Sequence, residues 1–264
     1  MISDSLLYAA LGTAFTFAMT TLGACAVFFF KKEPNPLFTK LALGFAAGIM
    51  IAASVWSLLI PAIEGAEAAG VLPALPSAGG FILGVCFLIL LDNLLPHLHL
   101  GSTHPEGPRV HLKRETLLFL AMTIHNIPEG MAVGVACAAA AAAGGGDALP
   151  AAAALALGMG IQNIPEGAAV TLPLHSAGNT RRKAFLMGAL SGLVEPIAAI
   201  AVVLAASNFA LVLPWLLSFA AGAMLYVVVE ELIPEARLGE HSNAGTLFVM
   251  AGFVLMMLLD TSLG

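Results

Sequence analysis

Two copies of one six-residue motif carry side chains that can bind a cation. Residues 125–130 read HNIPEG and residues 162–167 read QNIPEG. In each copy the first residue and the glutamate are four positions apart, so an α-helix places them on one face with the asparagine at its border. The side chains concerned are His125, Asn126 and Glu129 in the first copy and Gln162, Asn163 and Glu166 in the second. Each copy is therefore expected to aim three nitrogen or oxygen ligands at one spot.

The composition indicates that these polar motifs lie inside a membrane. Of the 264 residues, 59% are hydrophobic and only 10% are charged, and the mean hydropathy is +0.96. A soluble domain has about 25% charged residues, so this chain lacks the polar surface that water requires. It is predicted to be an integral membrane protein.

Each motif also contains a proline, which alters the helix beside the ligands. Pro128 and Pro165 have no backbone N–H, so the carbonyls of Ile124 and Ile161, one turn earlier, lose their usual hydrogen-bond donor. In hydrocarbon a freed carbonyl needs another partner, and a cation or a water molecule can supply one.

A third carboxylate, Glu195, precedes Pro196 in a later apolar segment. Burying one charge at mid-membrane costs at least about 2.5–3.5 kcal/mol, and the three segments that hold these glutamates contain no Lys or Arg. The carboxylates must therefore be protonated, hydrated or neutralised by a metal. Because they accompany His, Asn and Gln, a divalent ion such as Zn²⁺ fits better than Mg²⁺ or Ca²⁺, which prefer oxygen ligands alone. For Glu231, in another segment, protonation or an interfacial position is expected.

Eight apolar runs, separated by connections rich in Pro, Gly and charge, account for the chain. Such runs match membrane-spanning helices of about 20 residues, whereas a β-barrel would have short alternating segments. The predicted fold class is therefore all-α, a polytopic membrane protein with eight transmembrane helices in a single domain over residues 1–264. The runs are 5–30, 41–62, 78–96, 115–140, 150–174, 184–206, 209–234 and 244–263.

The basic residues predict the orientation, because cytoplasmic loops collect Lys and Arg. All ten fall in the first, third, fifth and seventh connections. These connections are therefore expected to face the cytoplasm, with both termini outside. The ten residues are Lys31, Lys32, Lys40, Arg109, Lys113, Arg114, Arg181, Arg182, Lys183 and Arg237.

The second and seventh runs share a sequence pattern. Residues 45–50 read FAAGIM and their run ends in Leu-Ile-Pro at 59–61, while residues 219–224 read FAAGAM and their run ends in the same tripeptide at 232–234. In the orientation above the two copies run in opposite directions, as in the inverted repeats of transporters. The alternative is that the small residues only allow close helix packing.

Other features exclude several classes of protein. The net charge of −6, without a basic patch, argues against a nucleic-acid partner. Cys25, Cys86 and Cys137 lie inside apolar runs without CxxC spacing, so they are expected to be small buried hydrophobes rather than a disulfide framework. Residues 1–8 carry no basic side chain, which favours a retained first span over a cleaved signal.

The two motifs, in the fourth and fifth of eight spans, resemble the ZIP (Zrt/Irt-like protein) metal-ion transporters, in particular the GufA-like branch. The resemblance covers essentially the whole chain, including the Glu-Pro pair at 195–196 and the end of the seventh span, which reads VEELIP at 229–234. It implies a 3+2+3 arrangement of the inverted repeat and uptake of divalent metal, mainly zinc, into the cytoplasm. The implied route is a paired-metal centre formed by the fourth, fifth and sixth helices of a homodimeric protein in the cell inner membrane.

The resemblance also assigns ligands to two metal positions. The first position takes His125, Gln162, Glu166 and Glu195, with Met50 of the second span as a thioether ligand from the opposite bundle. The second takes Asn126, Glu129, Asn163 and Glu166, with Glu195 as a further shared ligand. Much of the family has His where this chain has Gln162, and an amide is a weaker zinc ligand than an imidazole. Cd²⁺, Fe²⁺ and Mn²⁺ are therefore expected as candidate substrates beside Zn²⁺.

The third connection contains four of the seven histidines. They are expected to capture or sense metal at the exit, as in the family, or else to be ordinary solvated side chains. Asp92, Asn93 and Glu231 could form polar steps toward the exit, although Asp92 also fits an interfacial helix end. The four histidines are His97, His99, His104 and His111.

The predicted function is a metal transporter and not an enzyme. The alternatives are an intramembrane metal-dependent hydrolase, which also places His and Glu on facing helices, and a non-transporting metal sensor. A hydrolase is disfavoured because the chain has no HExxH motif and only His125 at membrane depth. The chain has no GxxxxGK[ST] phosphate-binding loop, so the sequence does not indicate that transport uses ATP.

Overall fold

Helices long and apolar enough to cross a membrane occur eight times in the described part of the chain, as the sequence predicts. The computed structural model describes residues 2–30, 36–98, 107–108, 112–144, 148–206, 210–236 and 243–263. The prediction of an all-α membrane protein with eight spans is confirmed.

Several spans consist of more than one helical segment. The first contains α1 (Ile2–Ala24) and α2 (Ala26–Phe29), and the second contains α3 (Pro36–Ala53), the π-helical η1 (Ser54–Leu59) and α4 (Ile60–Ala68). The third, fourth and fifth are α5 (Ala74–Leu94), α6 (Arg114–Ala142) and α7 (Ala148–Ser176). The sixth contains α8 (Arg181–Ser191) and α9 (Val194–Ala206). The seventh contains the 3-10 turn η2 (Ala210–Val212), α10 (Leu213–Val227), the π-helical η3 (Val228–Leu232) and α11 (Ile233–Ala236), and the eighth is α12 (Ala244–Leu263).

Span boundaries differ from the sequence prediction mainly in the second span. Its helix continues to Ala68, six residues beyond the predicted end at 62. The added residues include the exposed Glu64 and Glu67, because a helix can continue past the end of its apolar stretch once its side chains reach a polar environment. Hydropathy therefore located the apolar part of this helix and not its whole length.

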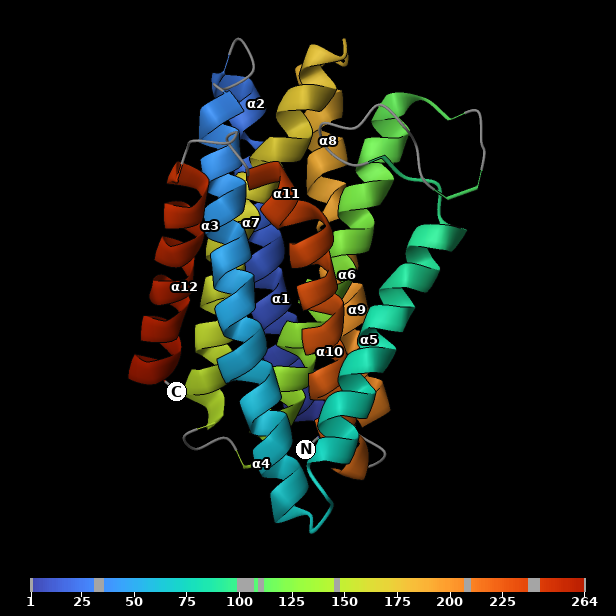
Figure 1. Ribbon diagram of the computed structural model, residues 1–264. Coiled ribbons are helices and arrows are strands. Elements are labelled where there is room, and N and C mark those ends of the chain that lie inside the picture. Colours follow the sequence, from blue (N-terminus) through green and yellow to red (C-terminus); the bar gives the residue numbers. More distant parts are fainter. Residues whose placement is uncertain are drawn as a thin grey trace.

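The spans alternate in direction, so both chain ends lie at the same end of the bundle (Figure 1). The described basic residues begin helices at the opposite end: Lys40 lies near the start of α3, Lys113 precedes α6, and residues 181–183 begin α8. This arrangement separates basic side chains from the termini. Lys31, Lys32, Arg109 and Arg237 lie outside the described residues, and the side chain of Arg114 is not described.

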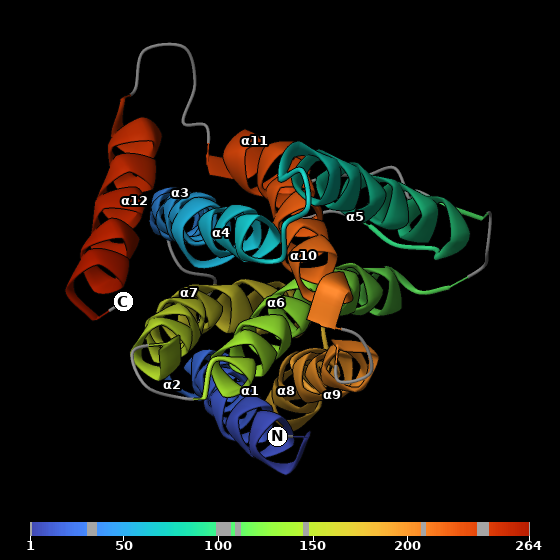
Figure 2. The same ribbon diagram turned by 90° about the horizontal axis from the view of Figure 1, so that it is seen from below.

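The helices form two bundles, which Figure 2 separates in a view along the helices. The first, here the ligand bundle, consists of α1, α6, α7, α8 and α9. The second, here the flanking bundle, consists of α3 to α5 and α10 to α12 with their π-helical segments, and in it α3 packs mainly on α12 and α5 on α10. Contacts of α3 and α12 with α7, and of α10 with α6, join the two bundles.

Glycine allows the closest helix approaches within each bundle. A Cβ atom added at Gly130 of α6 would overlap the backbone of Glu195 in α9, and one added at Gly222 of α10 would overlap the backbone of Phe81 in α5. Substitution at either position would force the helices apart, because a backbone atom cannot move aside as a flexible side chain can. The Gly130 contact also fixes the sixth span beside the first motif.

The two segments of similar sequence share an irregularity in the structure. In the second span the π-helical η1 directly precedes α4 with its Pro61, and in the seventh η3 precedes α11 with its Pro234. A proline cannot donate the hydrogen bond of the regular helical ladder, and a π-helical turn is one way in which a helix accommodates such an interruption. Both copies thus change helix geometry at the same point of the pattern.

Candidate metal centre

The eight predicted ligands are all buried near the middle of the molecule. Each of these residues is at most 6% exposed. Seven belong to the ligand bundle, three on α6, three on α7 and one on α9, while Met50 belongs to α3 of the flanking bundle. Both motifs lie inside continuous helices that pass through Pro128 and Pro165. The structure therefore brings the two motifs and Glu195 into one buried region.

Glu195 is held by hydrogen bonds from two other helices. Its Oε2 accepts a hydrogen bond from the hydroxyl of Thr16 in α1. Its Oε1 accepts one from the hydroxyl of Thr20, at 3.1 Å, and one from the Nδ2 of Asn163 in α7, at 3.0 Å. Gln162 donates from Nε2 to the Oδ1 of Asn163. Helices α1, α7 and α9 thus share one hydrogen-bond network.

Sequence reasoning did not identify Thr16 and Thr20 as part of the site. Both are buried, as is Thr13 one turn earlier on the same helix. The three threonines are spaced by three and four residues in an otherwise apolar span, which is the spacing of one helix face. This polar stripe was the available signal that α1 faces other polar groups.

A second set of polar atoms near the two motifs lacks hydrogen-bond partners among the described residues. It comprises Nδ2 of Asn126, both carboxylate oxygens of Glu129, Oε1 of Gln162 and Oε2 of Glu166. Leaving such buried groups unpaired costs about 1–3 kcal/mol each, and more for charged groups. A divalent cation would satisfy the four oxygens together, whereas the amide nitrogen of Asn126 is a donor and needs a hydrogen-bond acceptor.

The carboxylates of the centre lie close enough to interact electrostatically. Glu129 interacts with Glu166 and with Glu195, and Glu166 also interacts with Glu195 and Glu231. Like charges this close repel one another in a medium of low dielectric constant. A cation between them would convert that repulsion into attraction.

Among the described residues, no three His, Cys, Asp or Glu side chains are already arranged as a metal-binding cluster. Amide oxygens therefore have to complete the ligand set, or side chains have to rotate when the ion enters. The unpaired Oε1 of Gln162 is an amide oxygen of this kind.

Glu231, for which the sequence predicts protonation or an interfacial position, lies beside His125 of the centre. Its Oε1 contacts Nε2 of His125, so η3 of the flanking bundle meets α6 of the ligand bundle, and this contact is an ion pair when the histidine is protonated. A cavity of about 20 Å³, room for about one water molecule, adjoins this pair and is also lined by Glu166 and Glu235. Hydropathy alone could not place Glu231 here, because its neighbour comes from a helix about a hundred residues earlier in the chain.

Met50 is fully buried in the hydrophobic core that both bundles share. Its backbone carbonyl accepts a hydrogen bond from the hydroxyl of Ser54, at 2.8 Å. Apolar packing in the core is sufficient to explain why this side chain is buried. The assignment of Met50 as a metal ligand therefore remains a prediction from the resemblance.

The described part of the third connection contains one of its four histidines. His97 is fully buried, its Nδ1 lies 2.9 Å from the carbonyl oxygen of Leu95, and its Nε2 lies 3.7 Å from Oδ1 of Asp92. It is therefore not an ordinary solvated histidine. His99, His104 and His111 lie outside the described residues.

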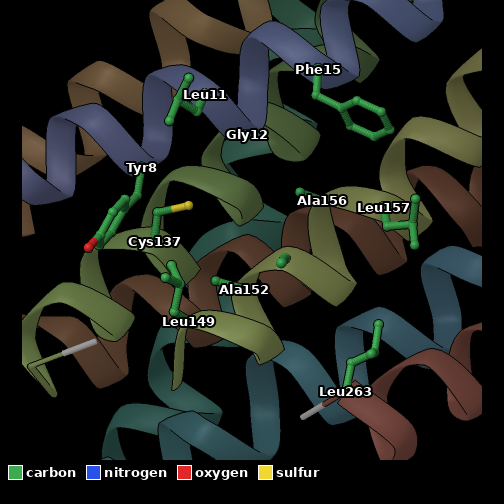
Figure 3. A pocket seen from close by; sticks show the side chains of 11 residues that line it. Tyr8, Leu11, Gly12, Phe15, Cys137, Leu149, Ala152, Ala156, Leu157 and Leu263 are labelled. Carbon is green, nitrogen blue, oxygen red and sulfur yellow. The ribbon is translucent and has the colours of Figure 1, made fainter. Parts of the chain in front are cut away.

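A larger cavity lies away from the residues of the metal centre, and Figure 3 shows its lining. It has a volume of about 540 Å³ and lies between α1, α6, α7 and the end of α12. Its lining is apolar apart from the hydroxyl of Tyr8 and the thiol of Cys137, with Phe15, Leu157 and Leu263 around them. A single thiol among hydrocarbon side chains does not make a metal site, so the ligands stay with the two motifs.

The three cysteines are free, as predicted, but they are not all buried. Cys137 is buried, Cys25 is partly buried and Cys86 is exposed. The expectation that all three are buried is wrong for Cys86, because a membrane protein also presents apolar side chains on its outer, lipid-facing surface. An apolar run in this class of protein does not tell which of its faces points inward.

Comparison with known proteins shows which family the sequence resembles. The sequence model described as ZIP zinc transporter matches residues 107–260. The chain is 38% identical to "Zinc transporter ZIP11" of Homo sapiens, over 99% of this chain and 98% of that protein. It is 42% identical to "Zinc transporter ZIPB" of Bordetella bronchiseptica, over 97% of this chain and 82% of that protein. It is 41% identical to "Zinc transporter GufA" of Myxococcus xanthus, over 79% of this chain and 81% of that protein.

Proposed function

Because the chain belongs to the ZIP zinc transporter family and is a divalent metal transporter rather than an enzyme, we propose that its ion crosses the membrane through the buried polar centre between α6, α7 and α9. The observation that carries this proposal is the set of unpaired oxygens on Glu129, Gln162 and Glu166. Carboxylate and amide oxygens beside His125 form a mixed oxygen and nitrogen ligand set that suits zinc.

We propose two neighbouring metal positions in the centre. The first would use His125, Gln162, Glu166 and Glu195, with Met50, and the second Asn126, Glu129, Asn163 and Glu166. The electrostatic contacts of Glu166 with both Glu129 and Glu195 support a carboxylate shared between the two positions. Because Gln162 replaces an imidazole with an amide, Cd²⁺, Fe²⁺ and Mn²⁺ are proposed as further substrates.

The direction of transport is inward in this proposal. Cytoplasmic loops collect basic residues, and the described basic residues gather at the end opposite the termini. Both termini would then lie outside the cell inner membrane. A homodimer is proposed from the family resemblance alone.

The two copies of the repeat would form related halves of the protein. In such a repeat, span two corresponds to span seven and span three to span eight. The packing of α3 (span two) on α12 (span eight) then corresponds to the packing of α10 (span seven) on α5 (span three). Both helix pairs are among the most extensively packed in the molecule. The shared π-helical turns before Pro61 and Pro234 support the same relation. This is the packing expected of an inverted 3+2+3 repeat.

The ion would change sides when the ligand bundle shifts relative to the flanking bundle. Within the bundles some glycines, such as Gly130 and Gly222, meet backbone atoms. Gly158, which faces the flanking bundle from α7, meets the side chains of Met256 and Ile49. Side-chain contacts can rearrange while backbone contacts hold each bundle rigid. The contact of His125 with Glu231 joins the bundles at the centre and would have to break during this movement.

Zinc flux into proteoliposomes, measured with an enclosed fluorescent indicator, tests the proposal. We expect Glu166→Ala to reduce uptake by about 100-fold or more, because the shared ligand is lost. Glu64→Ala, which alters an exposed glutamate of α4, is the matched control and should transport normally. Wild-type uptake by correctly inserted Glu166→Ala protein would overturn the assignment of the site.

A further inference from the structure

We propose that Thr16 and Thr20 of α1 are positioning residues of the metal centre, whose hydroxyls fix the carboxylate of Glu195 in one orientation and thereby set the affinity for the transported ion. The inference rests on the proposed function, because it takes Glu195 as a ligand. It adds a role for α1, a helix that carries no residue of either motif.

The hydrogen bonds around Glu195 leave it little freedom. A carboxylate has about four lone-pair sites, and three are occupied by donors from Thr16, Thr20 and Asn163. An ion can therefore reach Glu195 at about one remaining site, from one direction. The threonines thus favour binding through a single oxygen and limit where the metal can sit.

Each threonine hydroxyl has a choice of acceptor, and the carboxylate is the stronger one. The hydroxyl of Thr16 lies 3.2 Å from the carbonyl oxygen of Thr13, and that of Thr20 lies 3.2 Å from the carbonyl oxygen of Thr16. A hydroxyl can donate only one hydrogen, and a hydrogen bond to an ionised group is about twice as strong as one between neutral groups. Both hydrogens are therefore directed at Glu195 when it is ionised.

Thr20 also connects Glu195 to the second motif. The Nδ2 of Asn163 lies 2.9 Å from the hydroxyl oxygen of Thr20, which can accept this hydrogen bond while donating its own to Glu195. One threonine thus aligns an amide of α7 and a carboxylate of α9. A change at Thr20 is expected to disturb both predicted ligands.

The packing of α1 makes this contact specific. A Cβ atom added at Gly167 of α7 would overlap the backbone of Thr20, and one added at Gly192, between α8 and α9, would approach the Thr20 side chain to 3.0 Å. Two glycines from different helices therefore allow Thr20 to come close enough for its hydrogen bonds. This arrangement holds the hydroxyls rigidly against the centre.

Isosteric substitutions test the inference in the purified full-length protein. Thr16→Val and Thr20→Val keep the volume and remove the hydroxyl, and each is expected to weaken zinc binding measured by calorimetry by about 10- to 100-fold, the range for groups that orient a metal ligand. In proteoliposomes the KM for zinc should rise by a similar factor. Thr16→Ser and Thr20→Ser, which keep the hydroxyl, should restore most of the affinity.

Thr13→Val is the matched control on the same helix face. Thr13 is fully buried, and its hydroxyl donates to the carbonyl of Ala9 at 2.6 Å. A general effect of placing valine in α1 would lower zinc affinity in this variant too. We expect its affinity and KM to stay within about twofold of the wild type, and an equal loss in all three valine variants would overturn the inference.

A double-mutant cycle with Glu195→Gln separates this inference from the assignment of the site. If the threonines act through Glu195, the valine substitutions should weaken binding far less in the Glu195→Gln protein than in the wild type. Full additivity would overturn the positioning role while leaving Glu195 as a ligand. Unchanged zinc binding by Glu195→Gln itself would overturn the site and the inference together.

Discussion

The two motifs form two sides of the metal centre, here called the α6 wall (residues 125–130) and the α7 wall (residues 162–167). They have nearly the same sequence but different surroundings. On the α6 wall, Nδ2 of Asn126 and both carboxylate oxygens of Glu129 have no hydrogen-bond partner among the described residues. On the α7 wall, Asn163 donates to Glu195 and to Thr20. The motif provides the ligands, but the neighbouring helix decides whether a given side chain is free to meet an ion or already bonded to protein.

This difference assigns distinct roles to the two walls. On the α6 wall, the free carboxylate oxygens of Glu129 can gain a cation as their partner, so this side chain should contribute directly to binding. On the α7 wall, Asn163 is already bonded to α1 and α9 without an ion, so it should contribute mainly to the shape and stability of the centre. Oε1 of Gln162 and Oε2 of Glu166 on the same helix remain free and should contribute to binding. Variants on the two walls should therefore fail in different ways.

Among the variants that test this comparison, the largest effect should come from removing the charge of Glu129 on α6. Glu129→Gln keeps the side-chain shape but replaces a carboxylate without hydrogen-bond partners by a neutral amide. We expect zinc affinity to fall by about 100-fold, with no loss of thermal stability in metal-free buffer because a like-charge repulsion is removed. Calorimetry and thermal unfolding check the two parts, with Glu67→Gln on the exposed face of α4 as control. Unchanged affinity would show that the free oxygens of Glu129 do not meet the ion.

Substitution of Asn126 and Asn163 tests the comparison of the two walls through the free energy of unfolding. Asn163→Ala removes a donor to Glu195 and Thr20, and should lower the free energy of unfolding in metal-free buffer by about 1–3 kcal/mol. Asn126→Ala removes an amide nitrogen without a partner and should cost less. Denaturation of both variants in the same detergent gives the difference. Equal losses would mean that the two walls are not distinct in the metal-free protein.

A smaller effect is expected when the two motifs are made identical. Gln162→His turns QNIPEG into HNIPEG and places a second imidazole four residues before Glu166. Zinc and cadmium should then bind about tenfold more tightly relative to manganese, with slower turnover because a transport site must also release its ion. Competition uptake and metal titration measure the change. An unaltered preference for zinc over manganese would place Gln162 outside the ligand set.

The sequence alone determined the features that depend on local periodicity and on the membrane. Backbone groups in hydrocarbon must be paired within a helix, so long apolar runs predicted eight spans that the structure confirms. The spacing of His125 and Glu129, and of Gln162 and Glu166, placed each pair on one helix face for the same local reason. The gathering of the described basic residues at one end follows from the number and alternation of the spans.

Only the tertiary structure decided which helices meet at the centre. Thr16 and Glu195 are 179 residues apart in the chain, and Glu231 pairs with His125 from a different bundle. No local pattern specifies such contacts, because they depend on where glycines such as Gly130 and Gly167 let backbones approach and on how the bundles fit together. The different bonding of Asn126 and Asn163 has the same origin. The two motifs differ only at their first residue and both lie in α-helices, but α1 supplies hydroxyl groups to the second motif.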